Sequence, residues 1–144
     1  MAIKSYRYKV WLKQAELDLQ AAKLSLGNNF FEWACFQSEQ SAEKALKGVM
    51  VFCGEKPPKV HKLSILFKIA RELRPDLLKQ FEDVDSLQAV TFISRYPFII
   101  PGDNLTPHDF MTYQNATDCI SEAEKVLFLV KELVNSPNEH EPRF

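Results

Sequence analysis

Four polar residues, two of them lysines that can hold a phosphate, recur at helical spacing within residues 40–47. Gln40, Glu43, Lys44 and Lys47 stand at positions i, i+3, i+4 and i+7, so they form one polar stripe on an otherwise apolar helix. Spacing alone favours an ordinary solvent-exposed face, with Glu43 and Lys47 as an i,i+4 pair worth a few tenths of a kcal/mol. The alternative is a ligand-binding stripe in which the lysines hold an anion.

His61 follows the Pro-rich segment GEKPPKV and precedes the third predicted helix. A histidine in this position can transfer a proton, or bind phosphate near a helix N-terminus. It can equally cap the helix or satisfy a polar group at the edge of the core, which is the commoner role.

Arg95, Tyr96 and Pro97 close the fourth predicted helix. Arg95 can form a bidentate pair with a phosphate, and Tyr96 can stack on a base. The simpler interpretation is that Pro97 ends the helix and that Arg95 complements the negative end of the helix dipole.

Most catalytic signatures are absent from the sequence. It contains no GxGxxG or P-loop, no HExxH and no GxSxG. The three histidines, His61, His108 and His140, lie far apart, and no acidic cluster has metal-ligand spacing. We therefore expect neither a metal site nor a cofactor.

The bulk composition limits the kinds of partner. Eighteen Lys and Arg against nineteen Asp and Glu give a net charge of −1, so contact with nucleic acid requires a local basic patch. Three cysteines without a CxxC pair predict free thiols, with Cys35 and Cys119 as small buried hydrophobes. The sequence shows no apolar signal segment and no run long enough to span a bilayer, so a cytoplasmic location is expected.

Helical periodicity fills the stretches between the Gly- and Pro-rich breaks. It predicts three long helices and two shorter ones, with the fourth running from Asp76 to about Ser94 and the fifth beginning at an N-cap, Thr106. The expected fold is all-α, an up-and-down antiparallel bundle of four to five helices. One domain over residues 1–135 and a disordered tail over residues 136–144 are expected. The predicted core includes Trp11, Leu12, Ala34, Ala45, Leu87, Ile120 and Leu127.

Several of these segments, taken in order, resemble the HEPN family of helical nucleotide-binding domains. The segments are WLKQAELDL (11–19), FEWACFQSEQSAEKALK (31–47), PPKVHKLSIL (57–66) and Arg95-Tyr96-Pro97. The resemblance implies a dimerising helical bundle that works with a small nucleotidyltransferase, in some cases as a toxin–antitoxin-like pair. Many HEPN relatives are ribonucleases that use an Arg-x(4–6)-His motif. That motif is absent here, because twelve residues separate Arg95 from His108.

The sequence is compatible with three functions. The favoured one is a nucleotide- or RNA-binding subunit with a ligand site at Glu43, Lys44, Lys47, His61, Arg95 and Tyr96. The second is a metal-independent ribonuclease with a composite site of Arg95 and either His61 or His108. The third is a non-catalytic assembly subunit. An antiparallel bundle is expected to bring Arg95 opposite the polar stripe. A homodimer is expected through the aromatic residues Phe30, Phe31, Trp33 and Phe36, which point in several directions around the second helix.

Overall fold

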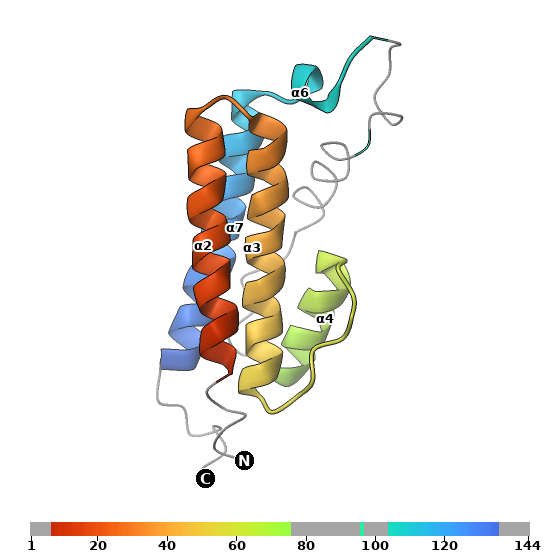
Figure 1. The fold of residues 1–144 in the computed structure, drawn as a ribbon. Helices are drawn as coiled ribbons and strands as arrows, with labels where there is room; N and C mark the ends of the chain where they lie inside the picture. Colours follow the sequence, from red (N-terminus) through yellow and green to blue (C-terminus); the bar gives the residue numbers. More distant parts are fainter. Residues whose placement is uncertain (1–6, 76–95, 97–103, 136–144) are drawn as a thin grey trace.

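The computed structural model of the chain describes residues 7–75, 96 and 104–135. Within these residues it contains five α-helices and no β-strand: α2 (Tyr8–Gly27), α3 (Phe31–Phe52), α4 (Leu63–Leu73), α6 (Pro107–Phe110) and α7 (Tyr113–Asn135). The long helices α2, α3 and α7 lie side by side, with α2 antiparallel to the other two (Figure 1). The short helix α4 flanks the C-terminal half of α3, and α6 lies at the other end of the bundle (Figure 1). The predicted all-α bundle is confirmed, while the fourth predicted helix lies outside the described residues.

Small residues allow α2 and α3 to approach closely. The Ser41 hydroxyl on α3 donates a 2.7 Å hydrogen bond to the Ala15 carbonyl on α2. A Cβ added to Gly48 would lie 3.1 Å from Leu12 Cδ2, which is tighter than an ordinary van der Waals contact, so a larger residue there would require Leu12 to shift. These contacts fix α3 against α2 and leave another face of α3 for α4 and the loop before it.

The buried core follows the predicted helical stripes with one exception among the described residues. Five of the residues predicted to be buried have at most 8% of their surface exposed: Leu12, Ala34, Ala45, Ile120 and Leu127. The prediction for Trp11 is wrong, because it is only half-buried and lines a surface pocket. The reason is its place in the first turns of α2, where Trp11 faces the loop after α3 across this pocket. Leu87 lies outside the described residues.

The turn between α2 and α3 depends on an asparagine in the left-handed region. Asn29 has φ 66°, a conformation that asparagine tolerates better than most residues. The amide of Phe30 then bonds back to the Ser25 carbonyl at 2.8 Å. The Ser25 hydroxyl donates to Gln37 Oε1 at 2.7 Å and so joins the two helices just beyond the turn.

The last predicted helix is two helices, because two N-terminal caps follow one another. Thr106 caps α6 through a reciprocal capping box with Asp109, as the N-cap prediction required. The chain then becomes extended at Met111. Thr112 and Asn115 form a second reciprocal pair, with N-to-side-chain distances of 2.9 and 3.0 Å, and α7 begins at Tyr113. Prediction of one continuous helix from Thr106 missed this second cap.

Two cysteines join α3 to α7 inside the core. Cys35 and Cys119 are free and buried, as predicted, and their sulfur atoms are 2.7 Å apart, with Cys119 donating to Cys35. The hydrogen bond that Cys119 donates to Cys35, together with burial, raises the pKa of the Cys119 thiol far above its ordinary range. The Cys119 thiol therefore stays protonated, and both cysteines act as small core side chains.

Candidate functional site

A buried carboxylate on α3 is the centre of the predicted polar stripe. Glu43 and Lys47 are only 4% and 6% exposed, and Lys47 Nζ lies 4.0 Å from Glu43 Oε2. The interpretation of these residues as a solvent-exposed face is therefore wrong. Helical spacing cannot show that α4 and the preceding loop cover this face, because it reports only which residues share it. Buried charges of this kind need partners, so the surroundings of Glu43 are informative.

His61 is the second partner of Glu43. Its Nδ1 lies 2.8 Å from Glu43 Oε1, although 74% of the histidine side chain is exposed. Helix α4 begins at Leu63 and has no side-chain cap, so His61 does not cap the helix. Its contact with the buried Glu43 is the other common role expected of it, which is to satisfy a polar group at the edge of the core. The contact holds one ring nitrogen and leaves the rest of the imidazole facing solvent. This is the arrangement in which a carboxylate orients a histidine for proton transfer or anion binding.

Lys44 belongs to a different contact. Its ammonium group pairs with Asp18 on α2, and both side chains are largely buried. Lys44 therefore supports the α2–α3 junction, while Glu43, Lys47 and His61 come together on the other side. Gln40 is half-buried on the same helix.

Tyr96 lies in a separate pocket near the N-terminus of α3. This pocket has a volume of about 530 Å³ and is lined by Glu32, Trp33, Phe36, Tyr96, Thr106, Pro107 and His108. Glu32 precedes Glu43 by eleven residues, which is about 16 Å along a helix. Tyr96 therefore does not share a pocket with His61. Arg95 lies outside the described residues, so its expected position opposite the polar stripe stays a prediction.

A second histidine–carboxylate pair lies beside Tyr96, and sequence reasoning missed its acidic member. His108 Nδ1 is 2.9 Å from Glu32 Oε2, and the His108 ring lies 5.7 Å from that of Phe30. Part of this arrangement is visible in the sequence, because Glu32, Glu39 and Glu43 recur at steps of seven and four and therefore share one face of α3. Periodicity could not show that His61 and His108 approach this face from 18 and 76 residues away.

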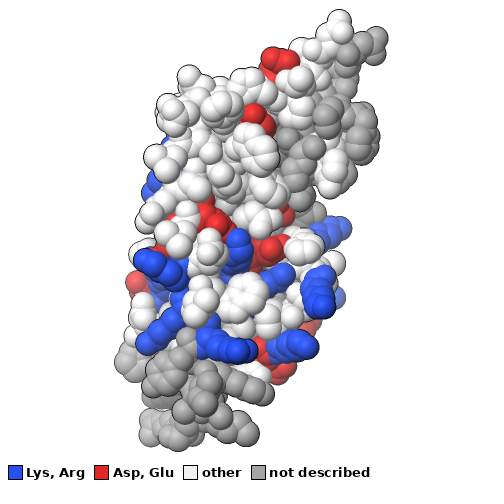
Figure 2. All heavy atoms as spheres, in the orientation of Figure 1, with Lys and Arg blue, Asp and Glu red and all other residues white. Residues whose placement is uncertain are grey.

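Positive charge is concentrated at the end of the bundle that holds His61. Residues 7–13 and 43–75 contain eleven of the eighteen Lys and Arg but only three of the nineteen Asp and Glu. These segments form the first turns of α2, the C-terminal half of α3, the following loop and α4. Figure 2 shows lysines and arginines gathered over this part of the molecule. The local basic patch that nucleic-acid binding requires is therefore present in a chain of net charge −1.

Two other kinds of site find no support in the described part of the chain. Within residues 7–75, 96 and 104–135, no group of three or more His, Cys, Asp or Glu side chains is arranged to hold a metal ion. Over the same residues, no helix combines the length and apolar character needed to cross a membrane.

Comparison with known proteins gives consistent similarities. The model of the HEPN domain matches residues 8–133. A protein of Methanocaldococcus jannaschii that bears the name putative toxin is 30% identical over 133 residues, which cover 88% of this chain and 87% of that protein. Human sacsin is 30% identical over 118 residues, 76% of this chain but only 3% of sacsin.

Two solved structures resemble the bundle as well. The crystal structure of an archaeal HEPN homologue superposes with a TM-score of 0.62 at 30% identity, covering 89% of this chain and 98% of that chain. A crystal structure of a protein from Thermus thermophilus gives a TM-score of 0.66 at 30% identity, covering 88% of this chain and 97% of that chain. Because the family model spans nearly the whole described bundle and relatives of similar length agree with it, this chain belongs to the HEPN domain family.

Proposed function

We propose that this HEPN domain binds RNA or a nucleotide through the basic end of the bundle. The observation that carries the proposal is the charge separation, in which eleven cations and three acids occupy residues 7–13 and 43–75. Lys44 and Lys47 are paired with carboxylates and Arg74 is buried, and seven of the other eight cations are exposed on this surface: Arg7, Lys9, Lys13, Lys56, Lys59, Lys62 and Lys68. Phosphates bind such a surface with release of counterions, so the interaction needs no overall positive charge. His61, held by Glu43 and surrounded in sequence by the exposed Lys59 and Lys62, lies within this surface.

Salt-dependent binding of a fluorescent single-stranded RNA tests this proposal. The variant carrying Lys59→Ala and Lys62→Ala should bind more weakly, and the slope of log affinity against log salt should fall by about 1.4, since each phosphate contact on a single strand contributes about 0.7. Lys125→Ala removes an exposed lysine from α7 and serves as the matched control. Equal affinities and equal slopes for the three proteins would refute binding at this surface.

A second candidate, a metal-independent ribonuclease, is favoured by the 2.8 Å contact between Glu43 and His61. With Nδ1 held by Glu43, the exposed ring can accept the proton of an RNA 2′-hydroxyl through Nε2. The 2′-oxygen attacks the adjacent phosphorus, the bond to the 5′-oxygen breaks, and that oxygen takes a proton from water. The products are a 2′,3′-cyclic phosphate and a 5′-hydroxyl. Neighbouring lysines stabilise the negative charge of the transition state.

Cleavage assays distinguish binding from catalysis, and one histidine from the other. If His61 is the base, His61→Ala abolishes cleavage, whereas His108→Ala, which removes the other histidine held by a glutamate, leaves it in place. An RNA with a 2′-deoxy sugar at the scissile position must stay intact. Binding of RNA with no products would exclude the ribonuclease and leave the binding function. Loss of cleavage in His108→Ala but not in His61→Ala would indicate that the active site is the Tyr96 pocket.

The proposal extends to a protein partner, a small nucleotidyltransferase. One similar protein bears the name putative toxin, and HEPN domains are expected to work with a small nucleotidyltransferase. We therefore propose a toxin-like role in which expression of this chain arrests growth and co-expression of a nucleotidyltransferase encoded beside it restores growth. Continued growth of cells expressing the chain alone would contradict the toxin-like role.

A homodimer through the N-terminal turns of α3 is part of the proposal. Phe30 and Trp33 are 49% and 54% exposed, and Phe31 and Phe36 are half-buried beside them. Exposed aromatic rings gathered in this way favour an interface. Analytical ultracentrifugation should give a dimer that Trp33→Asp converts to a monomer. A monomeric unmodified chain at tens of micromolar would refute the dimer.

A further inference from the structure

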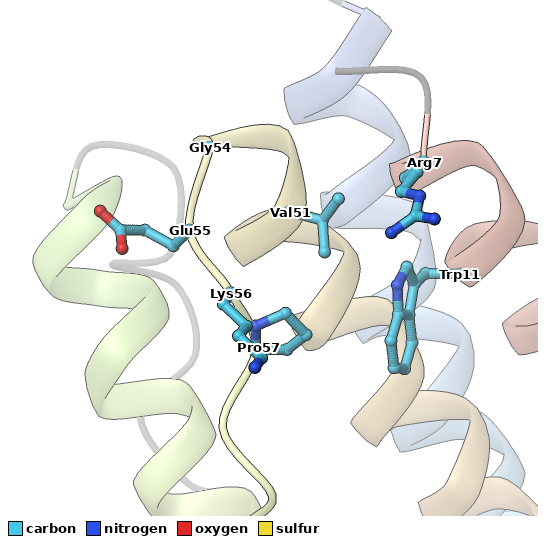
Figure 3. A pocket seen from close by; sticks show the side chains of 7 residues that line it. All are labelled: Arg7, Trp11, Val51, Gly54, Glu55, Lys56 and Pro57. Carbon is cyan, nitrogen blue, oxygen red and sulfur yellow. The ribbon is translucent and has the colours of Figure 1, made fainter. Parts of the chain in front are cut away.

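The half-buried Trp11 forms one wall of a pocket at the basic end of the bundle. The pocket has a volume of about 400 Å³, within the usual range for small-molecule sites. Figure 3 shows the Trp11 indole and the Pro57 ring on opposite sides of this space, with Val51 between them. Two flat apolar surfaces with an apolar floor suit a planar ring as ligand.

The charged residues of the pocket favour an anionic ligand. Arg7 and Lys56 line it together with Trp11, and Figure 3 shows the Arg7 guanidinium beside the indole. The carboxylate of Glu55 extends away from Trp11 in the same view (Figure 3). A ligand that combines a planar ring with a negative charge would satisfy both the apolar walls and the cations at the rim.

The pocket is connected to the proposed phosphate-binding surface by one row of α3. Val51 at the pocket, Lys47 and Glu43 follow one another at i, i−4 and i−8, so they lie on one side of the helix. Eight residues correspond to about 12 Å between the pocket and the carboxylate that holds His61. These three side chains are buried, so a strand that reaches both the pocket and His61 would lie over the exposed residues Lys59, His61 and Lys62 of the loop after α3.

We propose that this pocket binds one nucleobase of an RNA strand, stacked on Trp11, with the adjoining phosphate on Arg7 and Lys56. This inference rests on the proposed RNA-binding function and adds a defined base-binding position to it. A partner protein's aromatic side chain would fit the apolar walls as well. It would not use the excess of cations at this end of the bundle, so RNA is the ligand that accounts for both features.

Tryptophan fluorescence in the Trp33→Phe protein provides the test, because Trp11 is then its only indole. Titration with a short oligoadenylate should quench the emission, whereas an abasic oligomer of the same length should bind without quenching. Trp11→Ala should weaken oligoadenylate binding by roughly 5- to 150-fold, the range for loss of one stacked base. Titration with AMP and ATP shows whether a free nucleotide is sufficient or a strand is needed.

Two further variants distinguish a loss of binding from damage to the fold. Trp11→Phe preserves a stacking ring and should retain most of the affinity, and Lys56→Ala changes only an exposed side chain and should lower the salt slope by about 0.7. Oligoadenylate binding with unchanged Trp11 emission and no loss in Trp11→Ala would overturn the base pocket while leaving the basic surface as the RNA site. If neither the oligoadenylate nor the abasic oligomer binds, both proposals fail. Quenching by the oligoadenylate with an affinity that is insensitive to salt would support the pocket and refute the phosphate-binding surface.

Discussion

Replacement of Glu43 by glutamine should destabilise the protein strongly, because it leaves Lys47 buried without a carboxylate. Lys47 is 6% exposed and its ammonium lies 4.0 Å from Glu43 Oε2. Removal of one member of a buried ion pair costs about 3–5 kcal/mol. The flexible lysine stem can carry the ammonium part of the way to solvent, which lowers the expected loss to about 3 kcal/mol. Glutamine keeps an oxygen that can accept a hydrogen bond from His61, so the loss reports mainly on Lys47.

Urea and thermal unfolding measure this effect. A loss of about 3 kcal/mol corresponds to a decrease in Tm of roughly 6–12 °C for a chain of this size. Glu124→Gln is the matched control, since Glu124 faces Lys23 at 3.8 Å with both side chains about half exposed, and it should change the free energy of unfolding by less than about 0.5 kcal/mol.

A double-mutant cycle tests the stated cause. Adding Lys47→Met to Glu43→Gln removes the isolated charge and should recover much of the lost stability. A Glu43→Gln protein as stable as the Glu124→Gln control would refute the reasoning. It would show that Glu43 and Lys47 behave as an ordinary solvated pair on a helix surface.

Three further predictions concern the packing of α2 on α3, the pKa of Asp109 and the reactivity of the cysteines. Gly48→Leu should lower the free energy of unfolding by about 1–3 kcal/mol in urea titrations, because even a Cβ would lie 3.1 Å from Leu12 Cδ2. An unchanged midpoint would contradict the close approach of α2 and α3. Hydrogen bonds from Thr106 hold the pKa of Asp109 below its usual value. The stability this provides is present above about pH 4 and is lost as pH falls through the lowered pKa. Carboxyl chemical shifts should therefore show a higher Asp109 pKa in Thr106→Ala. Burial raises the pKa of the half-buried Cys53, so native protein should react slowly with a thiol reagent and expose all three thiols only on unfolding.

The helices and most of the core follow from the sequence because both depend on local periodicity. Leu12 and Ala45 are buried because a 3.6-residue repeat places them on the inner faces of α2 and α3. Trp11 shows the limit of that argument. The pattern gives the direction of its side chain, but the depth of burial depends on the loop after α3, whose path no periodicity specifies.

The site is harder to predict than the core for a related reason. Periodicity identifies Glu43 and Lys47 as neighbours on α3, and this proximity is confirmed at 4.0 Å. It cannot show which of them faces another helix, so Lys44 was grouped with them although it pairs with Asp18. Partners separated by long stretches of chain, such as Glu32 and His108, become visible only when the fold brings the segments together.

The two ends of α3 have different surroundings in a chain of net charge −1. Carboxylates on one face of this helix hold His108 near its N-terminus and His61 beyond its middle. Near the N-terminus the surroundings are aromatic, with Trp33, Phe36 and Tyr96 around the pair, which fits a protein or base contact. Towards the C-terminus the surroundings are basic, and RNA phosphates would be attracted there. Because both pairs are carried by one rigid helix, a dimer formed through the aromatic end would leave the basic end of each protomer open to its ligand.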